Sequence, residues 1–349
     1  MDLWILNPNY ERVGIVDTAS SIIWSNRYRQ CGDFEIYIPA SAERLELLQE
    51  DFLVVREDDD MVGIIETVEL TTDAETGDYL TITGRDLRSI LDRRIVWDQT
   101  SLNGTVEDIM RQLVTDAFIS PTNELRKYDK LTLADPHGYT DTASAQFTGD
   151  NLLEAIEGLC ATYNYGFKIT LEDGILVLDF YKGTDRSVSQ SENPHVVFSE
   201  EYGNLTASTY TRDKTGYKNI ALVAGEGEGK ARKRVPAQKL INGASPAGLL
   251  RREMFVDARD LSTNEGEIND ALYALKLLMR GSTYLSEAAI VESVEGTVNA
   301  LQMYTYKKDY FLGDIVTVAN RYRIQADTQL LETVETWDEN GYTCEPTYG

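Results

Sequence analysis

The same short motif stands near both ends of this 349-residue chain, and it restricts the possible folds more than any other feature. Ile65-Glu66-Thr67-Val68-Glu69 and Leu331-Glu332-Thr333-Val334-Glu335 are each followed by an acidic turn and a tyrosine, and the two segments close at Gly84 and Gly349. The four identical residues alone could arise by chance, but the same strand-turn-strand order surrounds both copies. Such repetition indicates repeated structural units, here two similar β-rich domains at the two ends of the chain.

Short apolar runs separated by turn residues fill residues 1–98, and they recur in residues 196–235 and 285–349. Short strands at this even spacing are typical of a β-barrel or a β-sandwich. Residues 1–98 are therefore predicted to form a first barrel domain, and the two later segments together a second one. One short helix is expected at Ser41–Gln49, with Ser41 as its N-cap.

Residues 99–195 have the mixed pattern of an inserted α+β domain. Thr105 and Asp150 are suitable N-caps for two helices, each of which has apolar residues at helical spacing. Glu172-Asp173-Gly174 separates two apolar runs, and an Asp-Gly pair in this position predicts a tight β-hairpin turn. A polar, serine-rich stretch at residues 184–193 marks the junction with the next domain.

A small helix-containing domain is predicted for residues 236–284. Ser262-Thr263-Asn264-Glu265 has the form of a capping box, and Gly281 is a natural helix stop. The apolar stripe expected to face the core comprises Ile268, Leu272, Leu275 and Met279. The expected fold class is thus β-rich α+β, with two similar antiparallel β-barrel domains, an inserted α+β domain and a small helix-containing domain.

The composition excludes several classes of protein. The formal net charge of −25 repels nucleic-acid phosphates, so specific or nonspecific nucleic-acid binding is not expected. This charge could serve solubility alone, or it could line a surface past which a polyanion slides. No apolar run is long enough for a membrane span. The N-terminus lacks a basic region and a cleavage-like site, which predicts synthesis in the host cytoplasm without a signal peptide.

Few residues are available for catalysis or metal binding. The three cysteines, Cys31, Cys160 and Cys344, are isolated, which argues against a disulfide framework or a zinc site. His137 lies in a turn-like segment and His195 follows a proline, so we expect ordinary surface histidines rather than catalytic bases. No catalytic residue, cofactor or metal site is therefore assigned, and the chain is not expected to be an enzyme.

Two charged segments resemble ligand-binding loops only superficially. The 225–230 segment is rich in glycine, but its glutamates would repel phosphate, and a hairpin tip is the preferred interpretation. The 58–69 segment nearly fits a calcium loop, but Val62 occupies its fifth position, so a charged turn is preferred. Both are candidate contacts with other subunits or with a lumen. The candidate residues are Glu57, Asp58, Asp59, Asp60, Glu226, Glu228, Lys230, Arg232, Lys233 and Arg234.

Four segments of the chain resemble one family of phage proteins. They are Gly32-Asp33-Phe34-Glu35-Ile36-Tyr37-Ile38-Pro39-Ala40, Gly84–Arg94, Leu312-Gly313-Asp314-Ile315-Val316-Thr317-Val318 and Glu345-Pro346-Thr347-Tyr348-Gly349. Together they are similar to the baseplate-hub proteins of long-tailed phages and prophages, including the N-terminal structural module of tail-associated lysins. The resemblance extends over the whole chain and is most specific in its first and last segments.

The resemblance implies a virion structural protein of the tail tip, or baseplate. In this family a homotrimer forms a ring whose two barrels per subunit match the sixfold tail tube, and DNA passes through it during genome ejection. Implied partners are the distal tail protein, the tail tube and tape-measure protein, and receptor-binding or tip proteins. Many relatives carry a C-terminal hydrolase or fibre, whereas this chain stops after the second barrel, so any lytic activity is expected on a partner. Two alternatives stay open: a carbohydrate- or receptor-binding module of the tail tip, and a cell-wall hydrolase.

Overall fold

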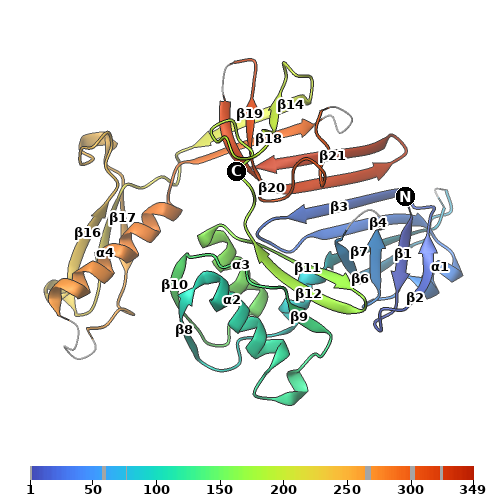
Figure 1. Cartoon of the computed structure of the whole chain (residues 1–349), viewed down its shortest axis with the longest axis horizontal. Coiled ribbons are helices and arrows are strands. Elements are labelled where there is room, and N and C mark those ends of the chain that lie inside the picture. The colour runs from blue at the N-terminus through green and yellow to red at the C-terminus, as the bar shows by residue number, and fades with distance from the viewer. Residues whose placement is uncertain (1, 57–59, 76, 264–268, 299–302, 323–324) are drawn as a thin grey trace. The chain divides into compact units, whose positions relative to one another are not determined.

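The chain divides into two compact units. Unit 1 comprises Met1–Thr209 and Val294–Gly349, and unit 2 comprises Tyr210–Ser293. Strands dominate, and four α-helices lie among the described residues, so the predicted β-rich α+β class is confirmed. The computed structural model (Figure 1) describes residues 2–56, 60–75, 77–263, 269–298, 303–322 and 325–349.

The first part of unit 1 consists of antiparallel strands with one short helix. The strands are β1 (Leu3–Leu6), β2 (Arg12–Val16), β3 (Ser21–Arg27), β4 (Asp33–Pro39), β5 (Leu53–Arg56), β6 (Val62–Thr71) and β7 (Tyr79–Asp86). In β4, Phe34, Ile36 and Ile38 are buried while Glu35 and Tyr37 are exposed, as expected for a strand with one face on the core. Helix α1 (Ala42–Leu47) begins directly after its predicted N-cap, Ser41.

The α+β region of unit 1 follows directly. Its elements are the 3₁₀ helix η1 (Leu87–Arg93), β8 (Thr100–Thr105), α2 (Val106–Val114), the π-helical turn η2 (Thr115–Ile119), the 3₁₀ turn η3 (Glu124–Arg126), β9 (Leu131–Leu133), β10 (Thr142–Phe147), α3 (Leu152–Tyr163), β11 (Gly166–Glu172) and β12 (Ile175–Tyr181). Helices α2 and α3 bury their apolar faces in the core of this region. β11 and β12 form a hairpin, which β9 extends as a parallel third strand.

The cap of α2 and the Asp-Gly turn are as predicted, whereas the cap of α3 differs by one residue. The Thr105 hydroxyl caps α2 by accepting the N–H of Asp108, as predicted. The cap of α3 is Asn151 instead of Asp150, because the Asp150 carboxylate accepts the N–H of Thr148 and leaves the capping position to its neighbour. The predicted Asp-Gly turn is confirmed, with both of its residues at positive φ between β11 and β12.

One thirteen-stranded sheet runs through the first and last parts of the chain. The later strands are β13 (Val197–Ser199), β14 (Leu205–Asp213), β18 (Val291–Val298), β19 (Ile315–Ala319), β20 (Gln325–Asp338) and β21 (Gly341–Tyr348). β20 pairs antiparallel with β3, so the red and blue strands lie side by side in Figure 1. The prediction of two separate barrels is therefore not confirmed, and no sheet of the described strands closes into a barrel. The long strand β20 instead pairs with the edge of β3, so neither β3 nor β20 keeps an exposed edge there.

The repeated motif forms the same three-stranded arrangement in both halves of this sheet. β5, β6 and β7 pair consecutively as antiparallel neighbours, and β19, β20 and β21 do the same. The register of the first hairpin shifts between Ile65 and Thr67, and that of the second between Leu330 and Glu332. The motif therefore encodes a long hairpin with an irregularity near its start, where a β-bulge increases the strand twist.

Unit 2 consists of a small sheet covered on one face by a helix. Its elements are β15 (Ile220–Ala224), the 3₁₀ turn η4 (Gly229–Ala231), β16 (Arg234–Gln238), the 3₁₀ turn η5 (Gly248–Leu250), β17 (Glu253–Asp257) and α4 (Asp270–Glu287). β15 is the central strand, antiparallel to β16 and parallel to β17. Residues 210–235, predicted to belong to the second barrel, share this unit with the helix. The four-domain division of the whole chain stays a prediction.

Helix α4 differs from its prediction in start, orientation and end. Its N-cap is Asn269, because this side chain accepts the N–H of Leu272; part of the predicted capping box lies outside the described residues. The buried stripe is Tyr273, Leu277, Gly281 and Leu285. Of the predicted stripe, Leu272, Leu275 and Met279 are exposed, and Ile268 lies outside the described residues. Gly281 does not end the helix. It allows α4 to approach the sheet, since an added Cβ would lie 2.6 Å from atoms of Val223 and Ala237.

Substitution of Gly281 by Val should loosen unit 2, because the added side chain overlaps the sheet. Overpacking of this kind costs about 1–3 kcal/mol, so the amide protons of β15, β16 and β17 should exchange faster in Gly281→Val than in the native chain. The matched control is Gly216→Val, since an added Cβ at Gly216 has nothing within 4 Å. Equal protection in the two variants would contradict the close helix–sheet contact.

Candidate functional site

A buried ion pair lies at the end of β7, inside unit 1. Asp86 and Arg88 are separated by one residue, and their side chains are 4% and 1% exposed. The Arg88 Nη2 lies 2.6 Å from the Asp86 Oδ2, and its Nε donates to both carboxylate oxygens at 3.0 Å. The same carboxylate caps η1 by accepting the Arg88 N–H at 2.8 Å. Burial alone would lower the pKa of Arg88, but the Asp86 charge reverses this effect and raises the pKa above its usual value.

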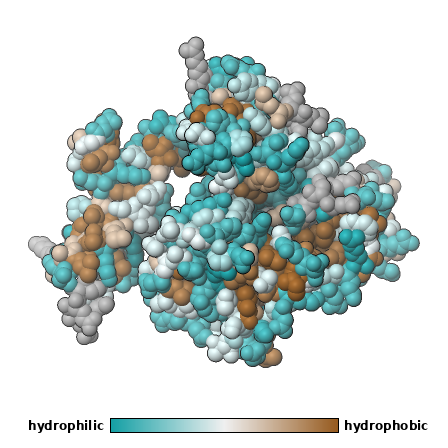
Figure 2. All heavy atoms as spheres, in the orientation of Figure 1, coloured by the Kyte–Doolittle hydropathy of each residue, from teal (hydrophilic) through white to brown (hydrophobic). Residues whose placement is uncertain are grey.

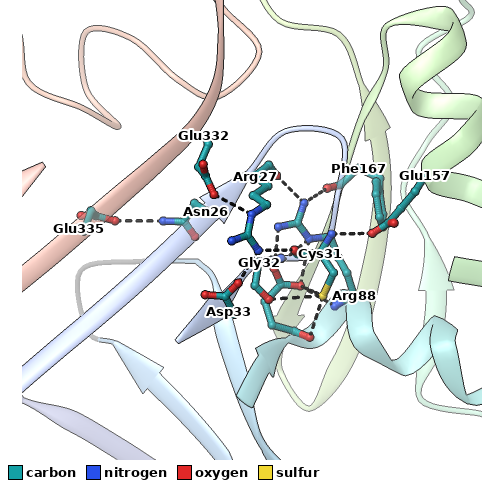
Figure 3. A network of polar contacts seen from close by, with 11 residues as sticks. Asn26, Arg27, Cys31, Gly32, Asp33, Arg88, Glu157, Phe167, Glu332 and Glu335 are labelled. Atoms are coloured by element: carbon teal, nitrogen blue, oxygen red, sulfur yellow. Dashed lines mark hydrogen bonds and ion pairs between the residues drawn. The ribbon is translucent and has the colours of Figure 1, made fainter. Parts of the chain in front are cut away.

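Arg88 connects two distant segments through its remaining donor group. Its Nη1 donates to the carbonyl of Arg27 at the end of β3 and to the carbonyl of Phe167 in β11, at 2.7 and 3.1 Å (Figure 3). The guanidinium also lies over the Phe167 ring, with 5.2 Å between its carbon and the ring centroid. The N-terminal strands and the α+β region therefore share one buried cation.

The loop between β3 and β4 closes over the Asp86 carboxylate. Gly32 donates its N–H to the Asp86 Oδ2 at 2.6 Å, and Asp86 returns its own N–H to the Gly32 carbonyl at 3.0 Å. A Cβ at Gly32 would lie 2.2 Å from the Ser25 carbonyl oxygen and 2.8 Å from the carboxylate, so only glycine fits. Next to it, the Cys31 N–H donates to the Glu157 carboxylate of α3 at 2.8 Å (Figure 3).

Tyr28 lies in the same loop and is fully buried among three glycines. An added Cβ at Gly166 or Gly313 would lie 2.2 or 2.3 Å from its ring, and the Gly183 N–H donates to its hydroxyl at 3.2 Å. Burial raises the pKa of Tyr28 to about 12, so the hydroxyl stays protonated at neutral pH. The Tyr28 N–H donates to the carbonyl of Leu331 in β20 at 2.8 Å, which joins this loop to the C-terminal strands.

The Leu312–Val318 segment, the third of the four that carry the family resemblance, contributes a second buried carboxylate. Asp314 accepts the N–H groups of Thr184 and Phe311 at 2.7 and 3.0 Å. It also pairs with the Arg186 Nε at 2.7 Å. Three of the four segments that carry the family resemblance thus meet at one place, which we call the junction. The junction comprises Tyr28, Cys31, Gly32, Asp86, Arg88, Gly313 and Asp314.

A second polar cluster holds β20 against the N-terminal strands. The buried Glu335 carboxylate pairs with Arg56 at 3.0 Å and with Lys307 at 2.9 Å. It also accepts hydrogen bonds from Asn26 at 3.0 Å and from Tyr342 at 3.1 Å. Burial by itself would raise the pKa of Glu335, but the two cations outweigh it and hold the pKa below its usual range. Glu335 is the last residue of the second motif copy. This copy of the repeat therefore helps to hold β20 against the N-terminal strands.

Burial sets the chemistry of two thiols, Cys31 in the junction and Cys160 in α3. Burial raises the pKa of Cys31 and of Cys160, so neither thiol ionises near neutral pH. His137 contacts the Asp179 carboxylate at 3.0 Å, and His195 contacts the Gln190 carbonyl at 2.9 Å. The described residues contain no cluster of three or more His, Cys, Asp or Glu side chains placed to hold a metal ion. None of the helices in that part of the chain has the length and apolarity that a membrane crossing requires.

The acidic turn chosen from the sequence is only partly described. Glu57, Asp58 and Asp59 lie outside the described residues, and Asp60 is exposed beside a cavity of about 420 Å³ that Arg27 and Arg88 also line. Its role as a contact with other subunits or with a lumen stays a prediction.

The charged hairpin tip chosen from the sequence lies in unit 2, where several of its side chains have partners. Glu226 accepts the N–H of Thr263 at 3.0 Å, and Lys233 pairs with Asp270 at 2.8 Å. The further partners are the Asp257 carboxylate for Arg232 and the Gly229 carbonyl for Arg234. Glu228 precedes η4 as its N-cap, and the side chain of Lys230 is not described. Contacts of these residues with other subunits stay a prediction.

Sequence reasoning missed the junction residues, although a signal was present. Asp86 and Arg88 stand within a buried run that also contains the apolar residues Leu87, Ile90 and Leu91. Charged residues inside such a run are expected to be paired, because an isolated buried charge is very costly. This pattern predicts the ion pair and its burial, but not its partners in β3 and β11.

Comparisons with known proteins agree with this architecture. The family model described as Siphovirus ReqiPepy6 Gp37-like protein matches residues 2–349. Among solved structures, the tail protein from Neisseria meningitidis MC58 is similar at 15% identity and a TM-score of 0.64, covering 99% of this chain and 95% of its own. The 43 kDa tail protein of prophage MuSo2 from Shewanella oneidensis is similar at 12% identity and a TM-score of 0.63, covering 100% and 98%.

A third solved structure extends this likeness to another host. Prophage tail protein gp18 from Listeria monocytogenes EGD-e is similar at 13% identity and a TM-score of 0.54, covering 99% of this chain and 94% of its own. No curated protein sequence matches. The likeness is one of fold over the full length of the chain, and the fold is that of phage tail proteins.

Loss of either partner of the buried ion pair should destabilise unit 1 strongly. Arg88→Met leaves the Asp86 carboxylate buried without its cation, which costs about 3–5 kcal/mol. Arg85→Met is the matched control. Arg85 lies in the same Gly84–Arg94 segment, but it is 36% exposed and pairs with Glu66 and Asp92 at the surface. That variant should lose about 1 kcal/mol or less. Urea unfolding measures both, and equal losses would contradict the role assigned to Arg88.

The Glu335 cluster should make stability depend on acid pH. Since the pKa of Glu335 is lowered in the folded chain, its contribution is complete at neutral pH. It is lost as the pH falls below the ordinary value of about 4.3 and through the folded pKa. Glu335→Gln should therefore unfold at lower urea than the native chain at pH 7, with the difference shrinking toward pH 3. A difference that is constant with pH would contradict an ionised Glu335.

Proposed function

We propose a structural role in the virion tail for this chain, which belongs to the Siphovirus ReqiPepy6 Gp37-like protein family. It acts as a hub at the distal end of the tail, where three copies form a ring between the sixfold tail tube and the threefold tip. The observation that carries this proposal is the likeness of fold to phage tail proteins over 99–100% of the chain. Catalysis has no part in this role.

The duplicated hairpin supports the change of symmetry. Each subunit presents two copies of the same three-stranded arrangement, β5–β7 and β19–β21, within one continuous sheet. Three subunits around a closed axis would present six such copies, which is the number that a sixfold tube requires. The β3–β20 pairing and the junction would hold the two copies of one subunit in a fixed relation.

The charge supports a passage for DNA through this ring. A net charge of −25 gives a surface that repels phosphates, so a duplex could slide past it without binding. The acidic turn at residues 57–60 is proposed to face this lumen or a neighbouring subunit, as is the charged hairpin at residues 225–234. The distal tail protein, the tail tube, the tape-measure protein and the receptor-binding or tip proteins are the proposed partners.

Light scattering of the purified full chain tests the ring. At micromolar concentration the mass should be that of three 39.3 kDa subunits, and it should persist at two salt concentrations. If the chain alone is a monomer, the distal tail protein should bring three copies together in one complex. A chain that stays monomeric both alone and with that partner would contradict the proposal.

A further inference from the structure

A cavity of about 430 Å³ lies in unit 1 between the N-terminal strands and the α+β region. Its volume is within the range of small-ligand pockets. Much of its wall is apolar, with Leu53, Ile64, Phe118 and Leu176 contributing from β5, β6, η2 and β12. None of these side chains belongs to the junction, and the role proposed above does not use this cavity.

Two consecutive arginines stand at this cavity, and only one of them has a carboxylate partner. The Arg93 guanidinium pairs with Asp51 at 2.8 Å. The Arg94 Nη1 donates to the Arg93 carbonyl at 3.0 Å, and its Nη2 lies 3.5 Å from the Arg126 carbonyl. Its Nε is a buried donor with no partner, and no ion pair joins Arg94 to any carboxylate in the described part of the chain. A positive site of this kind is unusual in a chain with a net charge of −25.

The surroundings of Arg94 disfavour its own charge. Burial lowers the pKa of Arg94, and the nearby cations Arg126 and Arg93 lower it further. The guanidinium is held over the Phe118 ring, with 4.9 Å between its carbon and the centroid. A bound anion would relieve the second effect, because it would supply a countercharge to the arginine cluster.

Exposed apolar side chains lie near the Arg94 end of the cavity. Arg126, whose carbonyl oxygen is 3.5 Å from the Arg94 Nη2, lies over the Trp97 ring at 5.2 Å and donates to the Ile95 carbonyl at 2.8 Å. Trp97 is 62% exposed and Leu125 is 93% exposed. Figure 2 shows hydrophobic side chains at the surface of unit 1 where the α+β region adjoins the N-terminal strands. Tryptophan and arginine together are typical of the centres of protein–protein interfaces.

We propose that this cavity and the adjoining Trp97 surface bind an acidic peptide segment of a partner protein. A carboxylate of that segment pairs with Arg94 and Arg93, and a bulky apolar side chain next to it enters the cavity. The extended apolar surface favours a polypeptide over a small anion, which would need the cavity alone. A nucleic acid is disfavoured, because the surrounding negative charge repels a polyphosphate.

Fluorescence anisotropy with the full chain tests this site. The probe is a fluorescein-labelled peptide of sequence Asp-Phe-Asp-Leu-Asp, and the matched peptides are Asn-Phe-Asn-Leu-Asn and Asp-Ala-Asp-Ala-Asp. The acidic apolar peptide should bind more tightly than either. Arg94→Gln should weaken its binding by about tenfold, which is the usual effect of losing one charged hydrogen bond. Arg93→Gln should weaken it as well, and this half-exposed position allows folding even where Arg94→Gln does not.

The control variant is Arg259→Gln, an arginine of unit 2 that is 70% exposed, and its affinity should equal that of the native chain. Three results of the peptide assay would overturn the proposal. They are equal binding of the acidic and neutral peptides, equal binding by all variants, and no binding of the acidic peptide at millimolar concentration. Binding of phosphatidylglycerol vesicles through Arg94, without binding of the peptide, would also overturn it and assign the site to a lipid surface.

Discussion

The ion pair between Asp86 and Arg88 is the interaction on which the rest of unit 1 depends. Removing both charges from water is costly, and the cost is recovered only where every remaining donor and acceptor is satisfied. Here the carboxylate accepts the N–H of Gly32 and the cation donates to the carbonyls of Arg27 and Phe167. The pair therefore specifies where the β3–β4 loop, η1 and β11 lie, because moving any of them leaves a buried polar group without a partner.

This constraint explains how the two copies of the three-stranded arrangement come to lie in one unit. A hairpin repeat alone would allow two independent domains, each with exposed strand edges. The loop that covers Asp86 also places Tyr28, whose N–H bonds to Leu331 at the start of the β3–β20 pairing. Glu335 then fixes the far part of β20 through Arg56 and Lys307. A unit 1 held together in this way would suit the proposed hub, which must hold its neighbours in a defined symmetry.

The sequence predicted what is local and missed what is distant. The repeat, the Thr105 cap and the Asp-Gly hairpin depend on neighbouring residues, and they were recognisable without a structure. The β3–β20 pairing joins strands about 300 positions apart, and no local pattern records which edge a strand will meet. Helix α4 has apolar residues on two faces, so spacing alone could not tell Leu275 from Leu277 as the buried one. The two charged turns can be recognised in the sequence by their charge, whereas Asp86 and Arg88 of the junction lie within an apolar segment.

Hydrogen exchange followed by mass spectrometry, comparing the native chain with Arg88→Met, tests most directly whether the junction holds unit 1 together. If it does, protection should fall together in the 28–32 loop, in β11 and in β20, although no hydrogen bond or ion pair among the described residues joins β20 to Arg88 itself. Protection in β15–β17 of unit 2 should be unchanged. A loss confined to η1 and its immediate neighbours would contradict the account, since it would mean that the ion pair stabilises only its own turn.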